Sequence, residues 1–279
     1  MPTSQRWTSP DIQVDSPSMS APNPGQPATG GTIPTLALLA LLSAAPFPPA
    51  PWGAGLFLLA LGVTVTSAKR SPPRVLHFGV LVTLMLGLLA IPGAWMTWPG
   101  PMILALALYW GARRRLPKAP GSLSRGEFDR GNALLMTVFI VLSASALVGW
   151  WWLFDPDLSD AVSRLPEVHV AVLIAAGLAF ACLNALGEEV IWRGLGMGAL
   201  HACGITGAPA HVLQAVSFGL MHIHGFPRGW IGVGLASVYG LMMGLLRIRS
   251  RGLLVPWVAH VFADLVIFAV LAALAAGSV

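Results

Sequence analysis

The sequence predicts an all-α fold, a polytopic membrane bundle of about eight transmembrane helices, from three observations. Of the 279 residues, 56% are hydrophobic and only 10% are charged, whereas soluble domains are about one-quarter charged. The mean hydropathy is +0.74. The apolar runs are continuous rather than alternating, which in a bilayer favours helices over a β-barrel. The chain is therefore expected to be an integral membrane protein.

Polar breaks divide the chain into a tail and a series of apolar runs. Residues 1–33 are rich in Pro, Ser, Thr and Gly, so we expect a disordered N-terminal tail rather than a signal peptide. The apolar runs are 34–48, 52–67, 75–96, 101–112, 132–153, 168–197, 209–224, 229–246 and 253–277. A span needs about 20 residues, and several runs have that length. We expect N-terminal transmembrane helices in 34–131 and C-terminal ones in 132–279.

Basic residues gather in three of the predicted loops. They are Lys69, Arg70 and Arg74; Arg113, Arg114, Arg115, Lys118, Arg125 and Arg130; and Arg247, Arg249 and Arg251. Two apolar runs separate the first loop from the second and four separate the second from the third, so one topology places all three on the same side. That side is predicted to be cytoplasmic. The net charge of +5 is thus a topology signal, and no nucleic-acid partner is expected.

Acidic residues inside the apolar runs are the best guide to function. Of the eleven acids, only Glu188, Glu189 and Asp264 lie there. A charged side chain at membrane depth costs from about 2.5 kcal/mol upward, so it usually faces a cavity, a partner or a substrate. The other ionisable residues that we single out in these C-terminal runs are Arg193, His222 and His260. The functional site is therefore expected in the C-terminal half.

Helical spacing sorts these residues into groups. Glu189 and Arg193 are four apart and can pair along one face, whereas Glu188 is turned about 100° away and is left to point elsewhere. His260 and Asp264 are also four apart, so the carboxylate could orient the imidazole and fix its tautomer. Two imidazoles and the free carboxylate could then hold one water molecule.

Three short motifs carry these residues. They are Glu188-Glu189-Val-Ile-Trp-Arg193, Phe218-Gly-Leu-Met-His222 and His260-Val-Phe-Ala-Asp264. They resemble the EExxxR, FxxxH and Hxxx(N/D) motifs of the CAAX-processing protease and bacteriocin-immunity family, which are intramembrane endopeptidases built of many helices. The resemblance covers about residues 165–275, whereas the N-terminal half carries no matching motif.

The resemblance implies a role for each residue. Glu188 would be the general base that activates the attacking water, and His222 would hold that water. Glu189 with Arg193 would fix the site, and His260 with Asp264 would stabilise the tetrahedral intermediate. The expected partners are a peptide or protein substrate at the membrane and the lipid bilayer itself.

Asp264 departs from the pattern of the prenyl-protein-processing members, which carry Asn there. A neutral amide can donate a hydrogen bond to an oxyanion, whereas an ionised carboxylate cannot. Asp264 is therefore protonated, or orients His260, or is a metal ligand. Two histidines and a carboxylate would suit a hydrolytic zinc ion, but the sequence has no HExxH and water can be activated without an ion. Both a zinc-containing site and a metal-free site are therefore kept as alternatives.

The first functional hypothesis is thus an intramembrane endopeptidase with a water activated by Glu and His. The alternatives are a non-proteolytic bacteriocin-immunity or scaffold protein of the same fold, and a proton-coupled carrier that uses the same acids as a relay. Two lysines beside fourteen arginines, with abundant Ala and Gly, indicate a GC-rich bacterial genome and hence a bacterial cytoplasmic membrane. Glu188 and His222 can lie at the same depth in the membrane only if the helix that carries Glu188 is long or tilted, or if residues 201–209 dip into the membrane.

Overall fold

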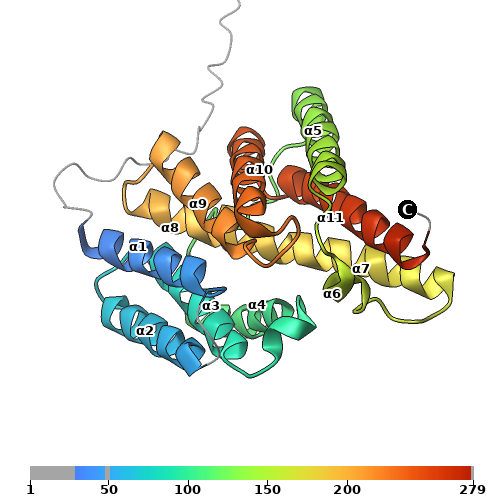
Figure 1. Cartoon of the computed structure of the whole chain (residues 1–279). Helices are drawn as coiled ribbons and strands as arrows, with labels where there is room; N and C mark the ends of the chain where they lie inside the picture. The colour runs from blue at the N-terminus through green and yellow to red at the C-terminus, as the bar shows by residue number, and fades with distance from the viewer. Residues whose placement is uncertain (1–28, 48–50, 278–279) are drawn as a thin grey trace, which may run out of the picture.

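A computed structural model describes residues 29–47 and 51–277, and helices are the only regular elements among them (Figure 1). This confirms the predicted all-α fold class. The N-terminal elements are α1 (Thr29–Ala44), α2 (Pro51–Ser67), α3 (Pro73–Leu89), η1 (Ala94–Thr97), α4 (Gly100–Ala112) and η2 (Arg113–Arg115). The C-terminal elements are α5 (Arg130–Phe154), α6 (Ser159–Val162), α7 (Val170–Glu188), η3 (Glu189–Gly196), α8 (Met197–Ala202), α9 (Gly207–Met221), α10 (Gly229–Arg249) and α11 (Leu254–Ala275).

The prediction of about eight spans is not confirmed. Within the described residues, four helical segments are long and apolar enough to cross a membrane: Arg130–Phe154, Val170–Ala202, Gly229–Arg249 and Leu254–Ala275. Three others, Gly30–Ala44, Trp52–Ser67 and Pro73–Leu89, are apolar but have 10–17 residues. At 1.5 Å per residue even the longest of these reaches only about 25 Å, short of a hydrocarbon core of about 30 Å.

The predicted tail of residues 1–33 lies mostly outside the described residues. Its last five residues, 29–33, differ from the prediction because they form the start of α1. Tertiary contacts hold this start of α1: Ser71 Oγ donates to the Gly30 carbonyl oxygen at 3.0 Å, and the fully buried Thr35 of the same helix lies 3.3 Å from Cys203 Sγ. The composition of the segment cannot reveal a contact with a residue so distant in the sequence.

The helices form two groups that share the long α7–η3–α8 segment (Figure 1). Helices α1–α4 pack on one another, and α3 also contacts η3 and α8. In the second group α9 pairs with α10, and α11 packs against both α5 and α7. Trp192 and Leu195 of η3 belong to the core that α1, α3 and α4 build. The N-terminal helices therefore support the segment that carries the two adjacent glutamates.

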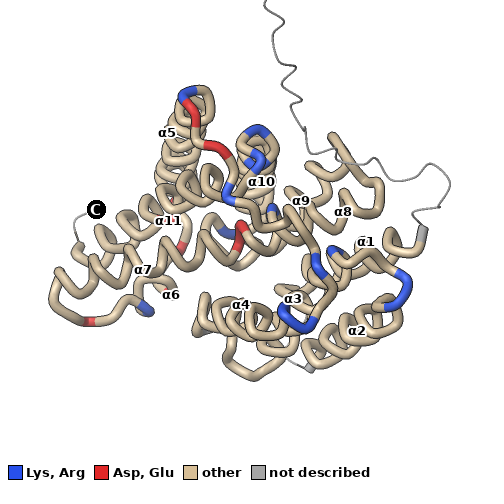
Figure 2. Tube along the Cα trace, turned by 180° about the vertical axis from the view of Figure 1, so that it is seen from behind, with Lys and Arg blue, Asp and Glu red and all other residues tan. Residues whose placement is uncertain are grey.

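The three basic loops lie together at one end of the bundle. Arg74 Nη2 donates to the Pro120 carbonyl oxygen at 2.7 Å, and Arg247 Nη2 donates to that of Gly121 at 3.1 Å. Figure 2 shows their Lys and Arg residues in blue around the ends of α3 and α10 and the turn after α2. In a different part of the chain, Arg228 donates to the Asp157 carbonyl oxygen. This hydrogen bond joins the loop after α5 to the loop before α10, and the same parity argument places these two loops on the side opposite to the basic loops. The grouping agrees with the parity argument, while the identity of the cytoplasmic side stays a prediction.

Helices α9 and α10 approach each other closely at Gly219, within the FxxxH motif. A Cβ there would meet Ser237 Oγ and lie 2.6 Å from the Val233 carbonyl oxygen, which cannot move without the α10 backbone. We therefore expect Gly219→Ala to lower the free energy of unfolding by about 1–3 kcal/mol through overpacking. Gly234→Ala is the matched control, since a Cβ at that glycine of α10 meets nothing within 4 Å. Equal stability of both variants in detergent unfolding would contradict the expectation.

Candidate active site

The two adjacent glutamates lie at a change of helix type. Glu188 is the last residue of α7, and Glu189 begins η3, which is a π-helical segment. π-Helical segments are rare in proteins overall, but those that occur often lie at functional sites. The continuous helical segment Val170–Ala202 has 33 residues, so Glu188 lies near its middle. The helix that carries Glu188 is therefore long, which is one of the arrangements that the sequence required for Glu188 to reach the depth of His222.

Glu189 is held by two partners at once. Its Oε1 accepts from Arg193 Nη1 at 3.1 Å and from His260 Nδ1 at 2.8 Å. The side chains of Glu189 and Arg193 have no exposed area, and that of His260 is 4% exposed. The Arg193 guanidinium also lies 4.3 Å from the centre of the Phe218 ring. The predicted Glu189–Arg193 pair is present, and it fixes His260 as well.

Glu188 faces the same imidazole as its neighbour. Its Oε2 lies 3.5 Å from His260 Nε2, while Glu189 engages the opposite ring nitrogen. The predicted grouping of the free Glu188 carboxylate with His260 is thus present. The spacing did not predict that Glu189, which was paired only with Arg193, reaches the same imidazole; the helix changes to π-geometry at Glu189. Glu188 Oε2 is buried and has no hydrogen-bond partner among the described residues.

Asp264 is linked to the N-terminal half through Asn184. Asp264 Oδ1 lies 3.9 Å from His260 Nε2, and its Oδ2 accepts from Asn184 Nδ2 at 3.1 Å. Asn184 Oδ1 in turn accepts from the indole Nε1 of Trp98 at 3.0 Å. Asn184 and Asp264 are both buried. The predicted proximity of Asp264 to His260 is present, and Asn184 is an additional member of the group.

His222 enters from the end of α9. Its Nδ1 lies 2.9 Å from the Phe218 carbonyl oxygen, and a carbonyl only accepts, so Nδ1 carries the proton. In a neutral ring Nε2 is then an acceptor. The Phe218 ring lies near both imidazoles, with its centre 4.5 Å from that of His222 and 5.9 Å from that of His260. His224, two residues further along the chain, is exposed.

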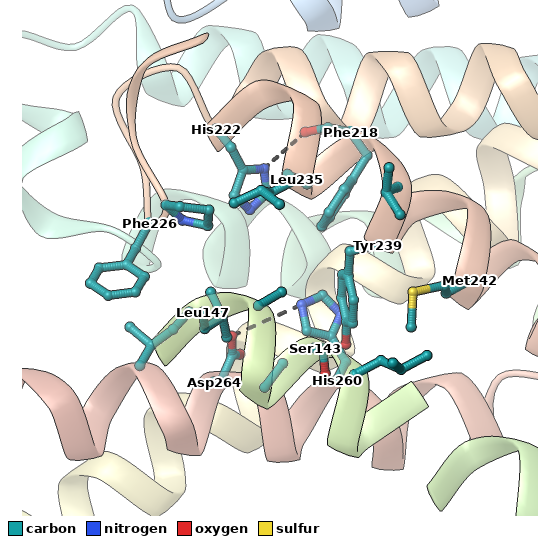
Figure 3. A pocket seen from close by; sticks show the side chains of 17 residues that line it. Ser143, Leu147, Phe218, His222, Phe226, Leu235, Tyr239, Met242, His260 and Asp264 are labelled. Carbon is teal, nitrogen blue, oxygen red and sulfur yellow. Dashed lines mark hydrogen bonds and ion pairs between the residues drawn. The ribbon is translucent and has the colours of Figure 1, made fainter. Parts of the chain in front are cut away.

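A cavity of about 290 Å³ joins these side chains. Figure 3 shows His222 and His260 pointing toward the same space from α9 and α11, with Tyr239 beside His260. The polar lining residues are Ser143, His222, Tyr239, His260 and Asp264, and the apolar ones include Leu147, Phe226, Leu235 and Ile267. Glu188 lies next to His260 rather than in the lining itself. The walls are mostly apolar, as is typical of sites that bind small or extended ligands.

The metal-ligand alternative for Asp264 has no matching arrangement in the described part of the chain. Nowhere among those residues do three His, Cys, Asp or Glu side chains come together as a set that could hold a metal ion. Asp264 Oδ2 is instead engaged by an amide.

Sequence reasoning missed Asn184, Trp98 and Tyr239. It counted ionisable groups at membrane depth, and these three are neutral at ordinary pH. Asn184 could have been found as a polar residue in an apolar run, four residues before Glu188 and hence on the same helical face. Tyr239 is one of only two tyrosines in the chain and lies in another such run.

The fold and the buried acid–histidine cluster define a helical membrane protein with a hydrolase-like site. Residues 170–266 match the family described as type II CAAX prenyl endopeptidase Rce1-like. Comparison with curated proteins and with solved structures gave no match. The matched region contains all three motifs, so this part of the chain is similar to the CAAX-protease family, a family of membrane proteases.

Proposed function

We propose that the protein is an intramembrane endopeptidase that hydrolyses a peptide bond of a membrane-proximal substrate. The observation that carries this proposal is the meeting of Glu188, Glu189 and His260 from two apolar helices beside a cavity that His222 also lines. Buried carboxylates at membrane depth are costly and are usually functional. The family match supports a protease in particular.

In the proposed reaction Glu188 is the general base. Its Oε2 is the carboxylate oxygen without a partner among the described residues, and it would take a proton from a water molecule that also donates to His222 Nε2. The water oxygen bonds to the carbonyl carbon of the substrate, and the π-electron pair of the C=O bond moves to the carbonyl oxygen. When the C–N bond breaks, the proton held by Glu188 passes to the leaving nitrogen.

His260 is assigned to the developing oxyanion. Glu189 fixes its Nδ1–H, so a second proton on Nε2 can donate toward the cavity. Asp264 Oδ1, 3.9 Å from that nitrogen, would help to orient the ring. Arg193 would act indirectly, because it holds Glu189 in place.

The substrate is proposed to be a peptide or protein segment at the surface of a bacterial cytoplasmic membrane, with the basic loops on the cytoplasmic side. The test uses the purified protein in lipid nanodiscs with peptides that carry an apolar anchor, and mass spectrometry identifies new termini. New termini that require active protein support the proposal. Their absence with intact fold favours the immunity or scaffold alternative, and pH-driven transport by proteoliposomes favours the carrier.

His222→Ala is expected to lower kcat about 100-fold, because the attacking water loses the nitrogen that holds it. His224→Ala is the matched control, since this imidazole is two residues away and exposed. It should cleave at the wild-type rate. Equal rates for the two variants in the nanodisc assay would remove His222 from the mechanism.

Zinc dependence is decided by metal analysis of the wild-type protein beside His222→Ala. One zinc per wild-type chain, reduced in the variant and required for cleavage, would assign a zinc ion to the site. Full cleavage by a metal-free preparation would assign activation of the water to Glu188 without an ion.

A further inference from the structure

Helices α7 and α11 run past each other with two opposed pairs of polar side chains. Asn184 faces Asp264, and one turn later Glu188 faces His260. The step of four residues toward the C-terminus of α7 matches a step of four toward the N-terminus of α11, so one antiparallel register sets both pairs. Asn184 thus belongs to the same face of α7 as the proposed base.

The orientation of the Asn184 amide follows from its partners. An indole N–H can only donate, so the amide oxygen of Asn184 must face Trp98 Nε1, 3.0 Å away. The NH₂ group then has to face Asp264 Oδ2, 3.1 Å away. Trp98 therefore determines which end of the amide Asp264 meets.

Asp264 is constrained in turn. Oδ2 accepts from Asn184, so the oxygen that faces His260 is Oδ1. On the far side of the ring, Glu189 Oε1 holds Nδ1–H at 2.8 Å. The imidazole is thus held at Nδ1 by a strong acceptor, while its Nε2 faces Glu188 Oε2 at 3.5 Å and the oriented Asp264 Oδ1 at 3.9 Å.

We propose that Asn184 is a positioning residue of the candidate site, which directs Asp264 Oδ1 toward His260 Nε2 so that this nitrogen remains a donor toward the reacting carbonyl oxygen. The proposal rests on the proposed function. Asn184 acts through Asp264 and touches no reacting atom. Trp98, which precedes the family-matched region, is the residue that orients Asn184.

The first test is Asn184→Asp. The new carboxylate still accepts from Trp98, but its other oxygen faces Asp264 Oδ2, so two acceptors oppose each other. We expect kcat to fall about 10- to 100-fold with KM within about threefold, since the substrate-binding walls are unchanged. A kcat within threefold of wild type, with the variant folded, would overturn the proposal.

The second test exchanges the two groups in the double variant Asn184→Asp with Asp264→Asn. The new amide on α11 can donate to the new carboxylate on α7 and turn its oxygen toward His260 Nε2. We expect kcat at least about tenfold above that of Asn184→Asp alone. A double variant whose loss equals the product of the two single losses would show independent sites and contradict the proposal.

Two tryptophan variants test the positioning role of Asn184 even if Asn184→Asp fails to fold. Trp98→Phe removes the N–H that orients Asn184, and we expect kcat to fall about 3- to 10-fold. Trp257→Phe is the matched control, because its indole likewise donates to a residue of α7, the Cys182 carbonyl oxygen, 3.0 Å away. Equal kcat values for the pair would overturn the proposal.

The same assay includes Glu188→Gln to separate the two claims. If Glu188→Gln cleaves normally, the endopeptidase proposal itself fails. If Glu188→Gln is inactive while Asn184→Asp is fully active, only the positioning role of Asn184 fails.

Discussion

Glu188→Gln is expected to abolish peptide cleavage, with kcat reduced at least about 1,000-fold, while the protein stays folded. The amide has nearly the same shape as the carboxylate but cannot take a proton from water. Glu188 Oε2 makes no hydrogen bond with a described residue, so the substitution breaks none there. The measurement is release of new peptide termini by wild type and variant in nanodiscs, beside a thermal unfolding curve of each.

Glu167→Gln is the control for this substitution, since it makes the same change at an exposed acid in the loop before α7. It should retain the wild-type rate. Cleavage by Glu188→Gln at more than about one-tenth of the wild-type rate would exclude Glu188 as the base. A scaffold or immunity protein would keep its phenotype in this variant, and a carrier would lose transport instead.

The fold class could be predicted because the bilayer leaves few choices. Continuous apolar runs with few charges must be helical, since lipid offers backbone groups no other partners. Run length was a weaker guide. Helices α1, α2 and α3 pack on each other, and α1 and α3 also contact the long α7–η3–α8 segment, although all three are shorter than an ordinary span. How many of these helices span the membrane depends on their tilt and packing, and hydropathy carries no information about either.

The residues of the candidate site could be predicted from spacing within each helix. Glu189 with Arg193 and His260 with Asp264 are both four apart, and both pairs lie close in the structure. Contacts between helices depend on how two helices are aligned with each other, and the sequence of one helix alone does not specify this alignment. The link from Asn184 to Asp264 is of this kind.

Local helix geometry set a second limit. A spacing argument assumes 100° per residue, but the helix widens at Glu189 and both glutamates meet His260. Tertiary contacts support this segment: a Cβ on Gly187 would lie 2.5 Å from the Met102 side chain, so α4 presses against α7 just before Glu188. The N-terminal half, which carries no motif, thus helps to determine the site.

Glu189→Ala is expected to be the most destabilising of these substitutions, lowering the free energy of unfolding by about 3–5 kcal/mol. It leaves the guanidinium of Arg193, which has no exposed area, without its counter-ion, and it removes the acceptor of His260 Nδ1. Glu127→Ala is the matched control, because its partner Arg251 and Glu127 itself are 78% and 63% exposed. Solvent replaces that interaction, so the loss should stay under about 1 kcal/mol. Reversible unfolding in mixed detergent micelles measures both, and a similar small loss in each would mean that the buried pair contributes nothing to stability.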